Sequence, residues 1–141
     1  MNTGESEIKP VTNILRYSYD QLKEVQVEMI TLDEHIEDQK LPIPQGLIMD
    51  IEGAGYFPLL GMQKTLKSVN FLYMEYVHHH LKNVSNVTVD VFAALITPHF
   101  KNARFLKDEK RISLEENADK LISYLNELSV RDKSDDILFT K

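Results

Sequence analysis

A heptad pattern of apolar residues near the start of the chain restricts the fold more than any other sequence feature. One apolar residue recurs every seven positions from Leu15 to Ile36, and a companion register runs from Val11 to Leu32 with one polar position. This spacing predicts a long helix over residues 10–39 with a coiled-coil seam, packed either within a bundle or against another chain. The seam residues expected at a protein interface are Leu15, Leu22, Val25, Met29, Leu32 and Ile36.

The segment 41–61 ends this helix, because three prolines and four glycines interrupt it. It is nevertheless too apolar for a solvated linker. We expect a Pro/Gly-rich crossover over the core, in the form of a strand, a small β-hairpin or a packed loop. Its glycines match neither the GxGxxG nor the GxxxxGK[ST] spacing of nucleotide-binding loops.

Helical periodicity returns after the crossover. A stripe that includes Leu66, Val69 and Tyr73 predicts a central helix over residues 62–84. The opposite side of this helix forms a second apolar face, which we expect to contact a partner protein. Shorter helices are predicted over residues 88–97 and 113–129, the latter from a capping box at its start. The expected contact residues of the second face are Phe71, Met74 and His78.

Together these patterns predict a mainly α fold, an irregular helical bundle in a single domain over residues 10–130. Residues 1–9 are expected to be a flexible N-terminus. Residues 131–141 form a C-terminal tail whose apolar trio, Ile137 to Phe139, either docks on the domain or binds a partner.

Three consecutive histidines, His78 to His80, are the strongest hint of chemistry in the sequence. Glu75 precedes His78 by three residues, which is half of the motif of di-metal carboxylate bundles, but the second half is missing. Adjacent helical side chains point about 100° apart, so the three rings do not converge on one ion. We therefore predict no catalytic residues, no metal and no cofactor.

The charge is distributed unevenly along the chain. The formal net charge is −6, and residues 1–40 hold nine acidic against four basic residues. A basic cluster follows in residues 101–111, and it is a candidate patch for an anion or an acidic partner surface. Because the chain is acidic overall, we favour a protein partner over nucleic acid for this patch. Its residues are Lys101, Arg104, Lys107, Lys110 and Arg111.

These observations favour a non-catalytic subunit or adaptor of a multi-protein assembly, with other protein subunits as partners in a hetero- or homo-oligomer. The first alternative is a small acidic inhibitor or immunity-type protein that blocks a basic site on its target. A third is a helical protein that contacts nucleic acid through residues 101–111. The absence of cysteine and of a long apolar run predicts an intracellular protein that does not span a membrane.

Overall fold

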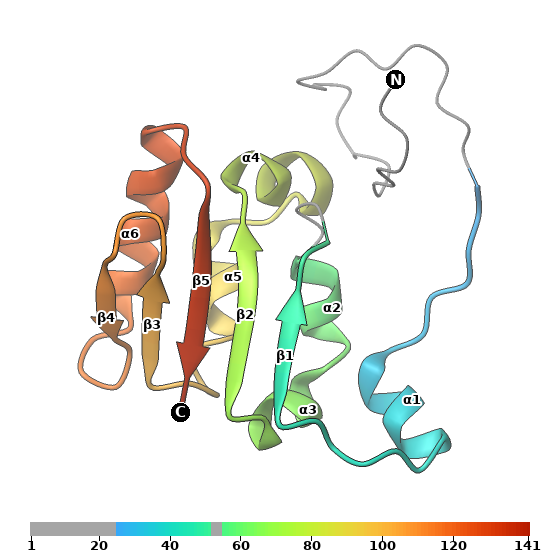
Figure 1. The fold of residues 1–141 in the computed structure, drawn as a ribbon. Helices are drawn as coiled ribbons and strands as arrows, with labels where there is room; N and C mark the ends of the chain where they lie inside the picture. The colour runs from blue at the N-terminus through green and yellow to red at the C-terminus, as the bar shows by residue number, and fades with distance from the viewer. Residues whose placement is uncertain (1–24, 52–54) are drawn as a thin grey trace.

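The computed structural model describes residues 25–51 and 55–141, and its centre is a mixed five-stranded sheet with the order β1-β2-β5-β3-β4 (Figure 1). β1 and β2 are parallel, whereas β5 runs antiparallel to both β2 and β3, and β4 antiparallel to β3. The prediction of a mainly α helical bundle is therefore wrong. The strands are β1 (Gly46–Met49), β2 (Phe71–Tyr76), β3 (Asn102–Phe105), β4 (Arg111–Ser113) and β5 (Asp135–Thr140).

Short helices connect the strands. Figure 1 shows α2, α5 and α6 behind the sheet, while no helix of the described residues lies over the front face. We call these two sides the covered face and the bare face. Within residues 25–51 and 55–141, no helix has the length and apolar character that crossing a membrane requires. The helices are α1 (Leu32–Asp38), α2 (Tyr56–Leu60), α3 (Gln63–Ser68), α4 (His78–His80), the π-helix η1 (Leu81–Ser85), α5 (Val89–Ala94) and α6 (Asp119–Val130).

The predicted central helix 62–84 is replaced by α3, the strand β2 and the short helices α4 and η1. β2 alternates between half-buried and buried side chains, as a strand at the surface of a core does. Leu72 and Met74 are buried on the covered face, so Met74 does not share a face with Phe71. The predicted second apolar face of a helix therefore does not exist.

The predicted long helix 10–39 is also wrong within the described part of the chain. Leu15 and Leu22 lie outside the described residues, and residues 25–31 contain no helix. Val25 and Met29 are exposed there, with 68% and 76% of their surface accessible. Leu32 and Ile36 lie on α1, a short helix whose N-terminus is capped by Thr31. The Thr31 Oγ1 accepts a hydrogen bond from the Glu34 N–H at 3.1 Å.

One carboxylate holds α1 against the start of α3. Asp33 accepts hydrogen bonds from the backbone N–H groups of Lys64 and Thr65, each at 2.8 Å. The Thr65 hydroxyl donates a third at 2.6 Å. The residue before α3, Met62, offers no side-chain cap. Asp33 therefore supplies from α1 the acceptor that the first turn of α3 lacks.

The C-terminal third is a β-hairpin, a helix and a strand. A helix does form within the predicted range 88–97, as α5, but α6 begins at Asp119 rather than at residue 113. Ser113 belongs to β4, and its Oγ accepts the Glu116 N–H at 3.3 Å in a turn outside the helix. The tail is not free, because β5 lies between β2 and β3. Ile137 and Phe139 are completely buried on its covered face.

Candidate functional site

Three strands end at one edge of the sheet. β1 and β2 are parallel, and β3 runs in the same direction because both β2 and β3 pair antiparallel with β5. Their arrowheads point the same way in Figure 1. We call this edge the carboxyl edge. Open sheets with parallel strands bind ligands outside the carboxyl ends of those strands, so the residues there form the candidate site.

Carboxylates gather on the bare face at this edge. Glu75 of β2 and Asp136 of β5 are directly paired across the two strands. The Asp136 carboxylate acts on the phenol of Tyr73, which lies on the same face of the neighbouring strand. Burial raises the pKa of Tyr73, and the negative charges of Asp136, Asp50 and Glu75 raise it further. The negative charges of three carboxylates thus act on one phenol. One of the three is Asp50, which directly follows β1.

Lys107 is the cation that faces this group. Its Nζ lies 3.6 Å from Asp136 Oδ2 and 3.9 Å from Glu75 Oε1. It comes from the turn between β3 and β4, far from β2 in sequence. Three carboxylates and one ammonium leave the edge negative, and this favours a cationic ligand over an anionic one.

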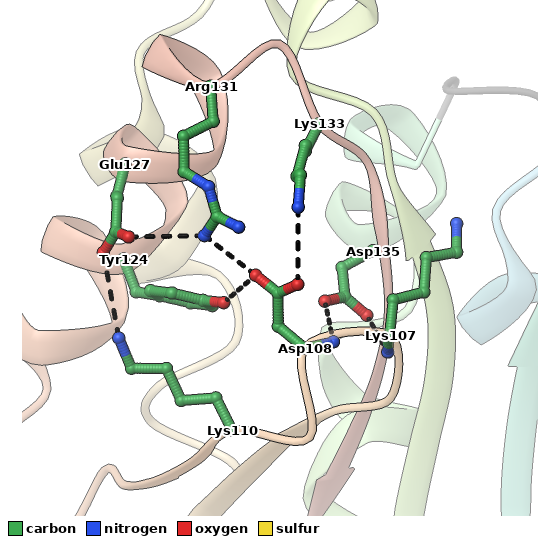
Figure 2. A network of polar contacts seen from close by, with 8 residues as sticks. All are labelled: Lys107, Asp108, Lys110, Tyr124, Glu127, Arg131, Lys133 and Asp135. Carbon is green, nitrogen blue, oxygen red and sulfur yellow. Dashed lines mark hydrogen bonds and ion pairs between the residues drawn. The ribbon is translucent and has the colours of Figure 1, made fainter.

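The turn that carries Lys107 is fixed by the polar network in Figure 2. Asp135 is buried and accepts the backbone N–H groups of Lys107 at 2.9 Å and of Asp108 at 3.2 Å. Asp108 in turn accepts a hydrogen bond from the Tyr124 hydroxyl at 2.6 Å and one from Arg131 Nη1 at 2.8 Å. Both partners lie on or next to α6. The network therefore anchors the turn to α6 and positions the Lys107 side chain.

The hydrogen bond from Tyr124 is the largest influence on the ionisation of Asp108. It lowers the pKa of Asp108, as do Arg131 and Lys133, although partial burial acts in the opposite direction. The same pairing works on Tyr124, whose pKa is raised to about 12 by burial and by the Asp108 carboxylate. Asp108 is therefore ionised and Tyr124 protonated in the neutral range.

A histidine and an aspartate meet where β2 ends. His78 Nε2 lies 3.2 Å from Asp132 Oδ1, and only 14% of the His78 side chain is exposed. Asp132 follows α6 in the left-handed region, with φ of 53°. His78 Nδ1 is buried and has no hydrogen-bond partner.

The rings of the three histidines contact one another edge to face and do not converge on one point. The His78 and His79 ring centroids are 5.3 Å apart and those of His79 and His80 are 4.3 Å apart, both edge to face. Across residues 25–51 and 55–141, no group of three or more ligand-type side chains is arranged to hold a metal ion.

The predicted basic patch is divided between different places. Lys107 belongs to the carboxyl edge. Lys110 lies over the Tyr124 ring, 3.5 Å from its centroid, and Lys101 pairs with Glu115 at 3.3 Å. Arg104 and Arg111 are exposed and directly opposite each other on β3 and β4.

Of the predicted interface residues, His78 is part of the candidate site. Phe71 lies on the bare face at the start of β2, at the opposite end of the strand, where its ring covers Gly46 so closely that a Cβ there would overlap it. No sequence pattern singled out Asp50, Tyr73, Asp132 or Asp136. Two predicted strands, each followed closely by an acidic residue or a histidine, would have indicated a site at the carboxyl edge. The sequence pattern of β2 instead predicted a helix.

Comparison with known proteins identifies a family. The model of the methyltransferase FkbM domain matches residues 2–128, which is most of the chain. No curated protein and no solved structure matches it. The match points to a methyltransferase-like enzyme, so the predictions of a non-catalytic adaptor, of a coiled coil and of the absence of enzymatic activity are wrong. The chain belongs to the FkbM methyltransferase domain family.

Proposed function

We propose that the chain is a methyltransferase whose reacting groups meet at the carboxyl edge of β1 and β2. The family supports the reaction class. The observation that carries the location is the pairing of Glu75 with Asp136 across β2 and β5, with Lys107 Nζ 3.9 Å and 3.6 Å from the two carboxylates. An intracellular location is part of the proposal, in keeping with the cysteine-free sequence.

The charge at this edge fits a cationic methyl donor. A sulfonium donor supplies an electrophilic methyl group and carries a positive charge. Glu75 and Asp136 would bind that charge from the bare face. When no cation is bound, the positive charge of Lys107 offsets the repulsion between the two carboxylates. The sequence has no GxGxxG turn, so we assign no residue to a nucleoside.

These carboxylates discriminate between donor and product. Methyl transfer removes the positive charge from sulfur, so the same carboxylates attract a neutral thioether less than the sulfonium. Asp132 has a separate, positioning role, because its contact with His78 at 3.2 Å fixes the chain where it leaves β2. The edge thus binds by charge and is held in shape by the contacts of α6.

The experiment is equilibrium dialysis of the full chain with S-adenosylmethionine and, separately, with S-adenosylhomocysteine. We expect the cation to bind more tightly, and the double variant Glu75→Gln/Asp136→Asn to lose that preference. The matched control is Glu115→Gln/Glu116→Gln, which makes the same change of charge just after β4, near the opposite edge of the sheet. Failure to bind S-adenosylmethionine, or equal losses in both double variants, would refute the proposal.

A further inference from the structure

Exposed apolar side chains are concentrated in the part of the chain that holds α1, β1 and α2. Of the twelve large hydrophobic residues exposed in the described ranges, nine lie between residues 25 and 60. Scattered exposed hydrophobic residues are ordinary, whereas a concentration of them marks an interaction surface. The nine are Val25, Val27, Met29, Ile30, Leu41, Ile43, Ile48, Ile51 and Leu60.

β1 is an open edge within this region. It is the end strand of the sheet and pairs only with β2 in the described part of the chain. Ile48 at its centre is 73% exposed on the bare face. Natural proteins protect such edges with charge, proline or a covering element, because unpaired backbone groups invite another strand. β1 itself has an apolar residue there instead.

The segment 25–30 has the complementary character. It is neither helix nor paired strand. Over residues 25–29 the apolar residues Val25, Val27 and Met29 alternate with Gln26 and Glu28, and the apolar Ile30 follows. Strict alternation is the pattern of a half-buried strand. Val27 and Met29 are each 76% exposed, and no strand of residues 25–51 or 55–141 pairs with this segment.

The anchor of α1 keeps this segment on the outside. The Asp33 N–H donates to the Gly61 carbonyl at 3.0 Å, and the Asp33 carboxylate binds the start of α3. Figure 1 shows the chain before α1 running along the outer side of the molecule, beyond β1. Among the described residues, each molecule thus has a segment with the sequence pattern of a strand that pairs with no sheet, and an end strand, β1, whose outer side is unpaired.

We propose that two copies of this chain associate about a two-fold axis, with residues 25–30 of each copy paired along β1 of the other. A second copy satisfies both unpaired features at once, because a two-fold contact is reciprocal. A membrane surface is disfavoured as the occupant. α1, next to the patch, carries Asp33, Glu34, Glu37 and Asp38, and anionic headgroups would repel it.

Light scattering after size exclusion tests the association. The full chain is expected to be a dimer at micromolar concentration, and Val27→Lys or Ile48→Lys to be a monomer with unchanged circular dichroism. Val130→Lys is the matched control, because Val130 is 88% exposed at the end of α6, and it should remain a dimer. A monomeric wild type, or a dimer that both β1-side variants leave intact, would overturn the proposal.

The absence of cysteine permits a second test that does not depend on stability. In Val27→Cys/Ile48→Cys, oxidation is expected to yield a covalent dimer, whereas pairing within one chain would yield a cross-linked monomer and contradict the exchange. Flotation with phosphatidylcholine and phosphatidylserine vesicles examines the competing occupant. Co-flotation of a monomeric chain that Ile48→Lys abolishes would replace the dimer by a membrane surface.

Discussion

The Asp132 carboxylate lies 3.2 Å from His78 Nε2 and joins the end of α6 to the end of β2. Asp132 holds a φ of 53°, a conformation that usually belongs to glycine at this place after a helix. The backbone there is stabilised by bonds from Asp132 N–H to the Ser129 carbonyl and from Lys133 N–H to the Leu128 carbonyl. An aspartate in this place sacrifices some stability for the position of its carboxylate.

Replacing Asp132 separates the backbone from the carboxylate. Asp132→Gly removes the contact with His78 but relieves the left-handed strain, whereas Asp132→Ala removes the contact and keeps the strain. We expect the glycine variant to be more stable than the alanine variant by about 1 kcal/mol. The half-exposed pair itself contributes at most about 1 kcal/mol. Urea denaturation measures the difference, and equal stabilities would show that the conformation is not strained.

Asp33 is expected to contribute more than other acidic residues of α1. Asp33→Ala removes the acceptor of three hydrogen bonds at the start of α3 and should lower the free energy of unfolding by about 1–2 kcal/mol. Glu37→Ala is the control, because its contact with Lys64 is more than two-thirds exposed on both sides and contributes little. Similar losses in the two variants would argue against the capping role.

The Asp33 carboxylate also makes the free energy of unfolding depend on pH in the acidic range. Burial alone would raise the pKa of Asp33, but the hydrogen bonds from Thr65 and Lys64 outweigh it and lower the pKa below 3.8. The stabilisation is therefore complete above pH 3.8 and is lost as the pH falls through the lowered value. The stability gap between wild type and Asp33→Ala, measured by urea denaturation, should shrink from pH 7 to pH 3. A constant gap would contradict this linkage.

Two tyrosines are expected to resist ionisation in alkali. Burial raises the pKa of Tyr76 to about 12, and burial together with Asp108 raises that of Tyr124 to about 12. Because the folded state favours the neutral phenol, this stabilisation is present below pH 10 and is lost as the pH rises towards 12. Absorbance at 295 nm during alkaline titration should show that part of the tyrosinate forms only well above pH 10. The amplitude of this late part should be smaller in Tyr124→Phe. A single transition of all tyrosines near pH 10 in folded protein would refute it.

Neighbouring residues of β5 should differ sharply on truncation. Phe139→Ala empties a fully buried position and should cost about 3–5 kcal/mol. Leu138→Ala affects a half-buried side chain on the bare face and should cost about 1 kcal/mol or less. Thermal or urea unfolding measures both. Equal costs would mean that the bare face is covered in solution, and the comparison is therefore best made in the monomeric Ile48→Lys background.

The strand β2 explains why the fold was predicted incorrectly. Five of the six residues in Phe71–Tyr76 are apolar or aromatic, so the burial alternation of a strand is hidden in the sequence. The residues on either side continue a helical spacing, and a period of 3.6 then fits as well as a period of 2. Pairing with β1 and β5, from distant parts of the chain, decides between them.

The start of α6 shows the same limit on a smaller scale. Ser113 and Glu116 have the spacing of a capping box, and the expected Glu116 N–H to Ser113 Oγ bond does form. The helix nevertheless begins only after Asn117, whose side chain accepts the Asp119 N–H at 3.0 Å. Ser113 is used by the sheet, where it pairs with Asn102. Local capping signals indicate hydrogen bonds correctly without fixing which element they belong to.

The candidate site depends on contacts that no local pattern contains. Glu75 and Lys107 are 3.9 Å apart, and His78 meets Asp132, only because β5 inserts between β2 and β3. Sequence reasoning could single out His78 and Lys107 by residue type. The sequence could not indicate that Asp136 and Asp132 lie beside these two residues, because residues 113–129 were predicted as a helix and residues 131–141 as a tail.

The most direct test of the account is to map where a methyl donor binds. Backbone amide resonances of the full chain, labelled with ¹⁵N, would be followed during titration with S-adenosylmethionine. We predict shifts at the carboxyl edge, in Asp50, residues 73–78, Lys107 and Asp136, and these shifts should weaken in Glu75→Gln/Asp136→Asn. Shifts confined to the opposite edge, around Lys101 and Glu115, or no shifts at millimolar donor, would contradict it.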